Sequence, residues 1–188
     1  KGKRLLNPAD RKLVGVHDAV RFTYEMACKI AANNDCMVSV LLGELGHTGI
    51  SLIVLDLDDC YDNEGNLEPL TEEFLKEFRE EEYETSSSGT GIHVYILTKL
   101  KLETFIVKEL EGCKSFECYT NKRHIVTTLF DFENTNLRVG EHDEFLKDLY
   151  SRVEEQRKKD EPNQFQKDVM SVFEGTVVKT TSEVNGKI

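Results

Sequence analysis

The feature of this sequence that most constrains its fold is an apolar run at residues 51–57 that ends among carboxylates. The run is far too short to cross a bilayer and is typical of a strand buried in a sheet. Asp56 and Asp58 stand at its end and are followed by Asp59. Side chains two positions apart on a strand point to the same face, so we expect Asp56 and Asp58 to lie together where a loop opens.

Composition and charge limit the class of protein. A chain of 188 residues with 39% hydrophobic and 31% charged residues can bury one sizeable core. Its net charge of −11 has the wrong sign for a broad nucleic-acid surface, so any such contact must be local, metal-dependent or supplied by another domain. No apolar segment follows the basic N-terminus, so we expect no membrane association and a cytoplasmic location, the host cytosol if the chain is viral or plasmid-encoded. The first residue is Lys, which favours a fragment of a longer protein.

The cysteines favour reduced thiols. Their number is odd and no CxxC pair occurs, which argues against a complete disulfide framework. A zinc site formed by Cys113, Cys118 and His124 is conceivable, but the spacing matches no established zinc pattern.

The order of apolar patterns predicts an α+β fold. Helical spacing is found at residues 16–33, 71–82 and from 141 onward, with a break at 161–163 and a shorter helix to 173. Strand patterns occur at 36–42, 51–57, 83–85, 92–98, 116–119 and 124–130, whereas 102–111 is ambiguous. We expect the first two strands to be adjacent and the last two to be joined by a tight turn at 120–122. The predicted organisation is one domain over residues 1–140, a helical extension over 141–175 and a mobile tail over 176–188.

Asp56 and Asp58 are candidate metal ligands. Carboxylate oxygens suit Mg²⁺ or Mn²⁺, and two such ions roughly 3.5–4 Å apart can activate a 3′-hydroxyl and stabilise a leaving pyrophosphate. An Asp-x-Asp pair at a strand end is also common as solvated loop chemistry, and the motif alone does not separate the two.

A second candidate is the segment 86–93, Ser-Ser-Ser-Gly-Thr-Gly-Ile-His. Its hydroxyls and backbone N–H groups can converge on an anion, and His93 can add a hydrogen bond or a positive charge. The segment therefore has the composition of a triphosphate-binding loop. The alternative is a plain polar turn with an incidental histidine.

A third candidate is Glu117, an acidic residue among apolar neighbours in a predicted strand. A carboxylate in such a strand is unfavourable unless it is paired or bound to metal. Glu117 either completes the site of Asp56 and Asp58 or forms an ion pair with Arg123 across the turn. Arg123 is also suited to bidentate phosphate binding.

Together the three blocks resemble the archaeo-eukaryotic primase superfamily, in particular the primase-polymerases of phages and plasmids. The resemblance rests on Asp-Leu-Asp at 56–58, Ser-Ser-Ser-Gly-Thr-Gly-Ile-His at 86–93, and Phe-Glu-Cys-Tyr at 116–119 followed by Arg-His-Ile-Val-Thr-Thr at 123–128. It covers residues 35–129. It implies a two-lobed α+β catalytic core built on a mixed or antiparallel sheet related to RNA-recognition modules, flanked by helices and followed by C-terminal helices.

The resemblance also implies an activity, which is template-directed joining of nucleoside triphosphates by a DNA primase or DNA polymerase in the replication of a mobile element, phage or plasmid. It makes Asp56, Asp58 and Glu117 the ligands of two Mg²⁺ or Mn²⁺ ions. The nucleotide-binding residues it implies are Ser86, Ser88, Gly89, Gly91, His93, Lys122, Arg123 and Thr128. The implied partners are a DNA template and primer, nucleoside triphosphates, and a helicase or helical domain in the full-length protein. His124 and Leu129 depart from the family pattern, which has an aromatic residue and a glycine there.

Alternative functions remain open. The segment 54–60 also looks like the first motif of haloacid-dehalogenase phosphatases, in which Asp56 would be a nucleophile and Asp58 a general acid. That family also needs a pair of aspartates at the end of a strand farther along the chain, and the sequence has no convincing pair of this kind. A calcium loop at 58–65 is excluded because Cys60 would occupy its first ligand position. A non-catalytic primase-like domain that binds nucleic acid is the remaining alternative.

Overall fold

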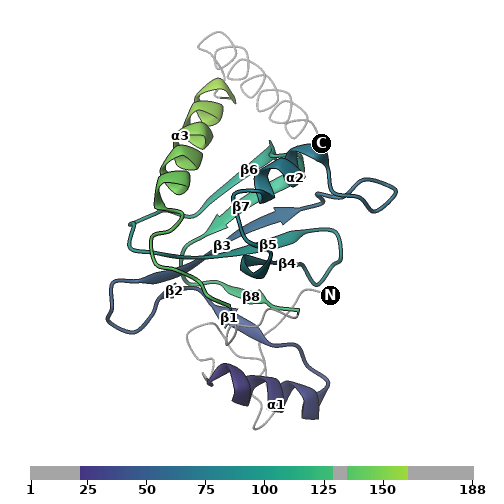
Figure 1. Ribbon diagram of the computed structural model, residues 1–188, viewed down its shortest axis with the longest axis vertical. Coiled ribbons are helices and arrows are strands. Elements are labelled where there is room, and N and C mark those ends of the chain that lie inside the picture. Colours follow the sequence, from purple (N-terminus) through teal and green to yellow (C-terminus); the bar gives the residue numbers. More distant parts are fainter. Residues whose placement is uncertain (1–21, 129–134, 161–188) are drawn as a thin grey trace, which may run out of the picture. The chain divides into compact units, whose positions relative to one another are not determined.

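The computed structural model describes residues 22–128 and 135–160 (Figure 1). In chain order its elements are α1 (Tyr24–Asn34), β1 (Ser39–Leu41), β2 (Gly43–Glu44), β3 (Ser51–Asp58), α2 (Pro69–Leu75), the 3₁₀ turn η1 (Glu80–Glu82), β4 (Tyr83–Thr85), β5 (Ile92–Thr98), β6 (Phe105–Leu110), β7 (Cys113–Tyr119), β8 (His124–Val126) and α3 (Asp143–Asp160). The chain divides into two compact units, one ending at Asp143 and the other beginning at Glu144. Residues 16–21 of the first predicted helix, Leu129, the break at 161–163, the helix to 173 and the tail at 176–188 lie outside the described residues.

The main sheet is antiparallel and has β3 in its interior. Its strand order is β4-β5-β3-β7-β6, and β2 adds a short pairing with the start of β3. Each recorded pairing in this sheet is antiparallel. The predicted α+β class is therefore confirmed at the level of helices combined with a mostly antiparallel sheet.

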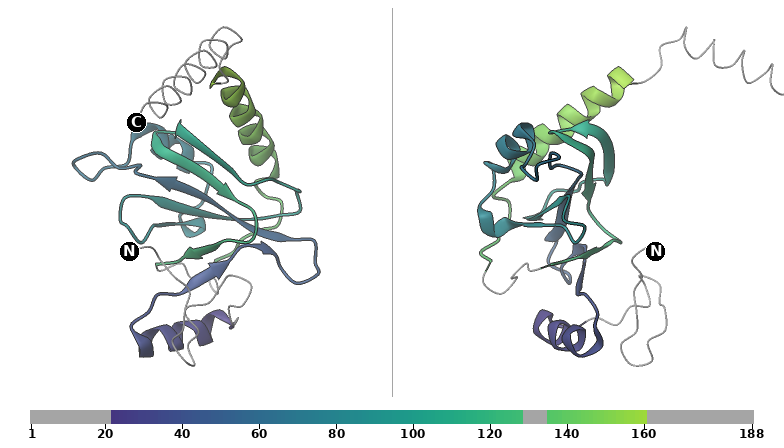
Figure 2. Two further views of the ribbon diagram at one scale, coloured as in Figure 1. Left: turned by 180° about the vertical axis from the view of Figure 1, so that it is seen from behind. Right: turned by 90° about the vertical axis from the view of Figure 1, so that its right-hand side faces the viewer.

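One face of the sheet is apolar and is covered by α2. Ile53, Leu55 and Leu57 alternate along β3 and are buried, and Leu57 lies opposite Phe116 of β7. Phe74 of α2 packs edge-on against Phe116 with ring centroids 5.4 Å apart, so α2 lies over this face (Figure 2). Pro69 at the first turn favours the helix start, because its fixed φ fits that position and its missing N–H is not needed there.

The opposite face is divided along the strands into an apolar half and a polar half. The apolar half forms a buried cluster with residues from β1, β8 and their flanks, consisting of Leu42, Leu52, Val54, Tyr95, Tyr119 and Ile125. β1 and β8 pair antiparallel with each other as a separate ribbon. Asp56 and Asp58 follow Val54 on the same face, just beyond this cluster. The apolar cluster beneath the β1–β8 ribbon thus ends at Val54 and does not include the acidic end of β3.

The pairing partners predicted for two strands were wrong. The strand predicted at 36–42 contains β1, which pairs with β8 and not with β3. The strand at 124–130 contains β8, which does not form a hairpin with β7. It pairs with β1, and the Leu42 N–H that follows β1 donates to Arg123 O. The register partner of β3 at its start is instead β2, reached through the glycine-rich turn that was predicted as a loop.

The predicted helix at 71–82 is also shorter than expected. It ends at Leu75, and Arg79 is extended, with φ −77° and ψ 152°. The backbone N–H of Arg79 donates to Glu82 Oε2 at 2.8 Å, and its guanidinium pairs with Glu82 Oε1 at 2.7 Å. These contacts begin the separate turn η1. The ambiguous segment at 102–111 forms the edge strand β6.

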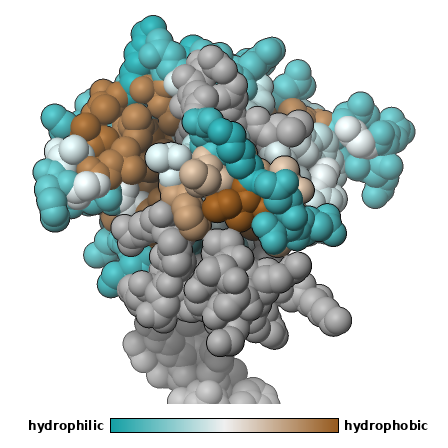
Figure 3. Space-filling model, turned by 90° about the horizontal axis from the view of Figure 1, so that it is seen from below, coloured by the Kyte–Doolittle hydropathy of each residue, from teal (hydrophilic) through white to brown (hydrophobic). Residues whose placement is uncertain are grey.

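Apolar side chains also reach the surface. The view from below shows an apolar area bordered by hydrophilic residues (Figure 3). Large apolar side chains that are more than two-fifths exposed in the described part of the chain are Phe22, Met26, Met37, Leu45, Leu70, Ile106 and Val139. None of the helices in the described ranges combines the length and the apolar character that a bilayer crossing requires.

Burial determines which thiols can react. Cys60 and Cys113 are free and buried, and desolvation raises the pKa of Cys60 to about 11 and that of Cys113 to about 12. Cys36 is free and exposed. Because the thiolate is the nucleophile, at pH 8 roughly one Cys60 thiol in a thousand is in the reactive form.

We therefore expect iodoacetamide at pH 8 to alkylate Cys36 rapidly in the native chain and to leave Cys60 and Cys113 unmodified until the chain is denatured. Mass spectrometry of proteolytic fragments after timed quenching measures each site. Cys36→Ser serves as the control and identifies the part of the fast phase that belongs to Cys36, since Cys28 is also free and partly exposed. Rapid native labelling of Cys60 would contradict the packing described for the end of β3.

Candidate functional site

Four strands each contribute one polar side chain to a single row across the sheet. Asp56 of β3 lies directly opposite His93 of β5 on one side and Glu117 of β7 on the other. Glu84 of β4 lies opposite His93. Directly opposed residues share a face, with Cβ atoms roughly 4.5–5.5 Å apart. The row Glu84–His93–Asp56–Glu117 therefore brings together three segments that are distant in sequence.

Asp58 lies beside this row on the same face. It is opposite Ser115 of β7, and Ser115 Oγ donates to Glu117 Oε1 at 3.0 Å. Asp59, which follows, has a φ of 51° and pairs with Lys114 Nζ at 3.2 Å. The hydrogen bond from Lys114 lowers the pKa of Asp59. Asp56, Asp58 and Glu117 are thus the carboxylates that face one another across β3 and β7.

These three carboxylates have the chemistry of a site for hard divalent cations. Each is partly exposed, with 15% of the Asp56 side chain accessible. Oxygen donors of this kind suit Mg²⁺ or Mn²⁺. Their ligand atoms do not all lie within 4.8 Å of one another in the described structure, and Glu117 is held by the hydroxyls of Ser115 and Tyr119. An ion bound by all three carboxylates would require Glu117 to exchange those hydroxyls for the metal.

His93 is buried between two carboxylates. Its Nδ1 lies 3.2 Å from Glu84 Oε1, and its Nε2 lies 3.6 Å from Asp56 Oδ1. With Glu84 ionised, its carboxylate only accepts hydrogen bonds, and Nδ1 is then the donor. The Nε2–Asp56 distance exceeds hydrogen-bond length, so Nε2 faces the acidic site without a short bond to it. His93 lies directly beside Asp56, and Glu84 is a neighbour that the sequence did not identify.

The Ser/Gly loop at 86–91 is a closed turn. Ser86 N–H donates to Gly91 O at 2.7 Å, and Gly89 N–H donates to Ser86 O at 2.9 Å. The hydroxyls of Ser86 and Ser88 are 2.8 Å apart, and those of Ser88 and Thr90 are 3.2 Å apart. The loop therefore presents a connected series of hydroxyls, of which those of Ser88 and Thr90 belong to exposed residues.

The two glycines of this loop have different roles. Gly89 has a φ of 80°, which L-residues rarely adopt, and open space around it. A Cβ on Gly91 would lie 2.6 Å from Leu57 O and 3.1 Å from Ser86 Oγ. Only a glycine allows the loop to pack this closely on the end of β3, which brings its hydroxyls toward the carboxylates.

Arg123 reaches the acidic row through an aromatic residue. Its Nη2 donates to the Tyr119 hydroxyl at 3.0 Å, and its guanidinium lies 4.3 Å from the centre of the Tyr119 ring. The Tyr119 hydroxyl donates in turn to Glu117 Oε2. Among the described residues no direct Glu117–Arg123 ion pair occurs, so that alternative is not what the structure shows. Lys122 is exposed in the turn, with a φ of 51°.

Thr128 binds Glu84. Its backbone N–H and its hydroxyl each donate to Glu84 Oε2 at 2.9 Å. Thr127 Oγ1 donates to the same oxygen at 3.0 Å, and the Tyr95 hydroxyl donates to Oε1 at 2.8 Å. Thr128 therefore reaches His93 only through Glu84. The one signal that could have revealed Glu84 is an acidic residue at the centre of a short predicted strand.

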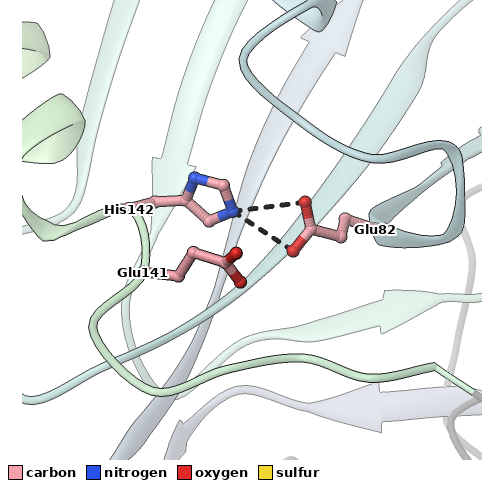
Figure 4. Close-up of side chains that lie close together, drawn as sticks. All are labelled: Glu82, Glu141 and His142. Carbon is pink, nitrogen blue, oxygen red and sulfur yellow. Dashed lines mark hydrogen bonds and ion pairs between the residues drawn. The ribbon is translucent and has the colours of Figure 1, made fainter.

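A second acidic group lies away from this row. Ligand atoms of Glu82, Glu141 and His142 all lie within 4.8 Å of one another, and His142 Nε2 is 3.2 Å from both oxygens of Glu82 (Figure 4). The Arg79 guanidinium also binds this group, at 2.7 Å from Glu82 and 2.8 Å from Glu141. Arg79 supplies the positive charge that a cation would otherwise bring, so the group is explained as an ion-pair network. The sequence analysis did not identify it.

Comparison with known families adds no assignment: no protein-family model matches the chain, and no curated protein matches it significantly.

Metal-dependent stability distinguishes the two acidic groups. We expect Mn²⁺ at about ten times its dissociation constant to stabilise the chain by about 1.4 kcal/mol and to raise the unfolding midpoint by about 3–5 °C. Asp56→Asn/Asp58→Asn should stay folded and lose this shift, because it removes the ligands together with their mutual repulsion.

Differential scanning fluorimetry with and without Mn²⁺ measures the shift. Glu141→Gln is the matched control and should retain it. If Glu141→Gln loses the Mn²⁺-induced rise in the unfolding midpoint and the double Asp variant keeps it, the ion binds to Glu82, Glu141 and His142 instead.

Proposed function

We propose that this chain carries a two-metal nucleotidyltransferase site that joins nucleoside triphosphates on a DNA template, with the fold of a primase-polymerase core. The observation that carries the proposal is the sheet register, which sets Asp56 opposite both Glu117 and His93. These are the residues that the three sequence blocks assign to metal and phosphate binding. Their convergence from three strands supports one site in place of three unrelated motifs.

The acidic residues act as the metal ligands in this proposal. Asp56, Asp58 and Glu117 would hold two Mg²⁺ or Mn²⁺ ions, which supply activation of a 3′-hydroxyl and stabilisation of a leaving pyrophosphate when bound. The Ser115 hydroxyl holds one oxygen of Glu117 and limits its rotation. No protein nucleophile is required for this reaction. Asp56 therefore serves as a ligand and not as the phosphate acceptor of the phosphatase alternative.

The neighbouring polar groups bind and orient the triphosphate. The exposed hydroxyls of Ser88 and Thr90 can donate to its oxygens, and Nε2 of His93 faces the same region. The Tyr119 ring supports the Arg123 guanidinium, which presents a planar set of donors suited to phosphate. These groups would align the α-phosphate with the 3′-hydroxyl.

Charge explains why the activity should depend on metal. The row contains several carboxylates in a chain of net charge −11, so a triphosphate is repelled until cations are bound. The same reasoning makes DNA binding local to the site and dependent on its ions. A helicase or helical domain in the full-length protein would supply wider contacts with the template and primer. The proposed setting is replication of a mobile element, phage or plasmid.

The direct test is extension of a labelled DNA primer on a template with deoxynucleoside triphosphates and Mn²⁺ or Mg²⁺. We expect metal-dependent extension that falls by at least about 10³-fold in Asp56→Asn/Asp58→Asn, since the metal contribution amounts to several kcal/mol. Repeating the assay without primer tests priming. Denaturing gels measure product length.

Glu72→Gln/Glu73→Gln on the exposed side of α2 changes the net charge equally and should retain activity. A folded, Mn²⁺-binding wild-type chain that extends no primer would contradict the proposal. Release of phosphate from p-nitrophenyl phosphate by that same preparation, lost on Asp56→Asn, would favour the phosphatase alternative.

Arg123 has a separable role in this mechanism. Arg123→Gln removes the charge and the stacked guanidinium, and we expect the KM for the nucleotide to rise about tenfold with a smaller change in kcat, as for a contact made equally in the ground and transition states. Steady-state primer extension at varied dATP concentration on an oligo(dT) template measures both constants. Arg138→Gln, an exposed arginine outside the site, should leave them unchanged. An unaltered KM in Arg123→Gln excludes a nucleotide contact.

A further inference from the structure

We propose that Glu84 is a positioning residue that holds the His93 ring in the orientation the site uses. The ring contact itself stands on geometry, and only its consequence for nucleotide binding rests on the proposed function. Glu84 is buried on the edge strand β4, directly opposite His93, and its side chain is 6% exposed. It is separated from Asp56 by His93 in the row, so it acts through that ring.

The carboxylate of Glu84 is held from both sides. Oε2 accepts from Thr127 Oγ1, Thr128 N–H and Thr128 Oγ1 at 2.9–3.0 Å. Oε1 accepts from the Tyr95 hydroxyl at 2.8 Å and from His93 Nδ1 at 3.2 Å. Donors that surround both oxygens match the acceptor-only character of a carboxylate. The carboxylate is therefore fixed in place before it restrains His93.

This restraint determines which nitrogen of His93 faces the acidic site. Rotation of the imidazole about its last side-chain bond has broad minima, so packing and hydrogen bonds must select the orientation. With Nδ1 bound to Glu84, Nε2 points toward Asp56. The Tyr95 ring packs edge-on to the imidazole, with centroids 6.4 Å apart. Loss of the Glu84 contact would free the ring to turn Nε2 away from the phosphate-binding region.

The contacts also explain why threonines beyond β8 belong to the site. Thr127 and Thr128 follow β8 and bind Glu84 Oε2 of β4. Thr128 Oγ1 also lies 2.9 Å from Thr85 O of the same strand. Glu84 thus transmits the position of that segment to His93. This is the role we assign to Thr128 in place of direct nucleotide contact.

A single substitution separates positioning from bulk stability. In Glu84→Gln the backbone N–H of Thr128 can only donate, so the amide oxygen must occupy the Oε2 position. The amide NH₂ then faces His93 Nδ1, which loses its acceptor. The variant keeps the size of the side chain. Glu82→Gln is the matched control, because Glu82 is also buried, lies on the adjacent turn and contacts Arg79 and His142.

The first measurement follows the ring nitrogens of His93 by NMR. Two-bond ¹H–¹⁵N correlation spectra of the full chain labelled with ¹⁵N-histidine report the protonation and bonding of each ring nitrogen, and His93→Asn assigns the His93 signals. We expect Glu84→Gln to shift both His93 ring nitrogens and Glu82→Gln to leave them in place. Unchanged His93 signals in a folded Glu84→Gln variant overturn the proposal, whether or not the chain extends primers.

The second measurement determines the affinity of the site for a nucleotide. Isothermal titration of dATP in the presence of Mn²⁺ should show about tenfold weaker binding for Glu84→Gln, comparable to the loss of one charge-assisted hydrogen bond. In the His93→Asn background Glu84→Gln should add less than about twofold, since coupled residues are not additive. An equal effect with and without His93 overturns positioning through that ring. If Glu84→Gln shifts the His93 signals but the wild-type chain binds no dATP, the proposed function is rejected and the role of Glu84 in holding the ring is retained.

Discussion

The antiparallel pairing of β3 between β5 and β7 is the interaction on which the candidate site depends. Asp56 acquires both of its neighbours in the row from one register. A slip of one residue in either pairing would move the paired side chain to the opposite face. His93 or Glu117 would then lie on the apolar face covered by α2, and an apolar neighbour would take its place beside Asp56. Burial of the apolar face of β3 thus fixes the register and, through it, the composition of the site.

Much of the local structure could be predicted from the sequence, but the neighbours across strands could not. The period-two pattern of β3 placed Asp56 and Asp58 on one face, because that inference needs only the geometry of a single strand. The predicted partners of β1 and β8 were wrong because strand pairing is decided by contacts between residues that are distant in sequence. Glu84 was missed for the same reason: its neighbours Thr127 and Thr128 lie more than forty positions away. Whether these residues bind nucleotides stays a prediction.

The chain contains two acidic groups that differ in how their charge is balanced. Glu82 and Glu141 are bound by Arg79, so their charge is neutralised within the protein. Asp56 and Glu117 are flanked by an imidazole and by hydroxyl groups, which offer less compensation than a guanidinium. The first arrangement stabilises a turn of the fold. The second remains electrostatically suited to recruit cations, which is the property a phosphate-transfer site needs.

The place of Glu84 on β4 has a consequence for dynamics. β4 spans Tyr83–Thr85 at the edge of the sheet and is paired on one side only, with β5. Short edge strands open more readily than interior ones, so the free energy of local opening of β4 sets how often His93 loses its restraint. The apparent affinity of the site for a ligand is proportional to the fraction of molecules in which β4 is closed. A peripheral strand of three residues can thereby limit the occupancy of a site built on the centre of the sheet.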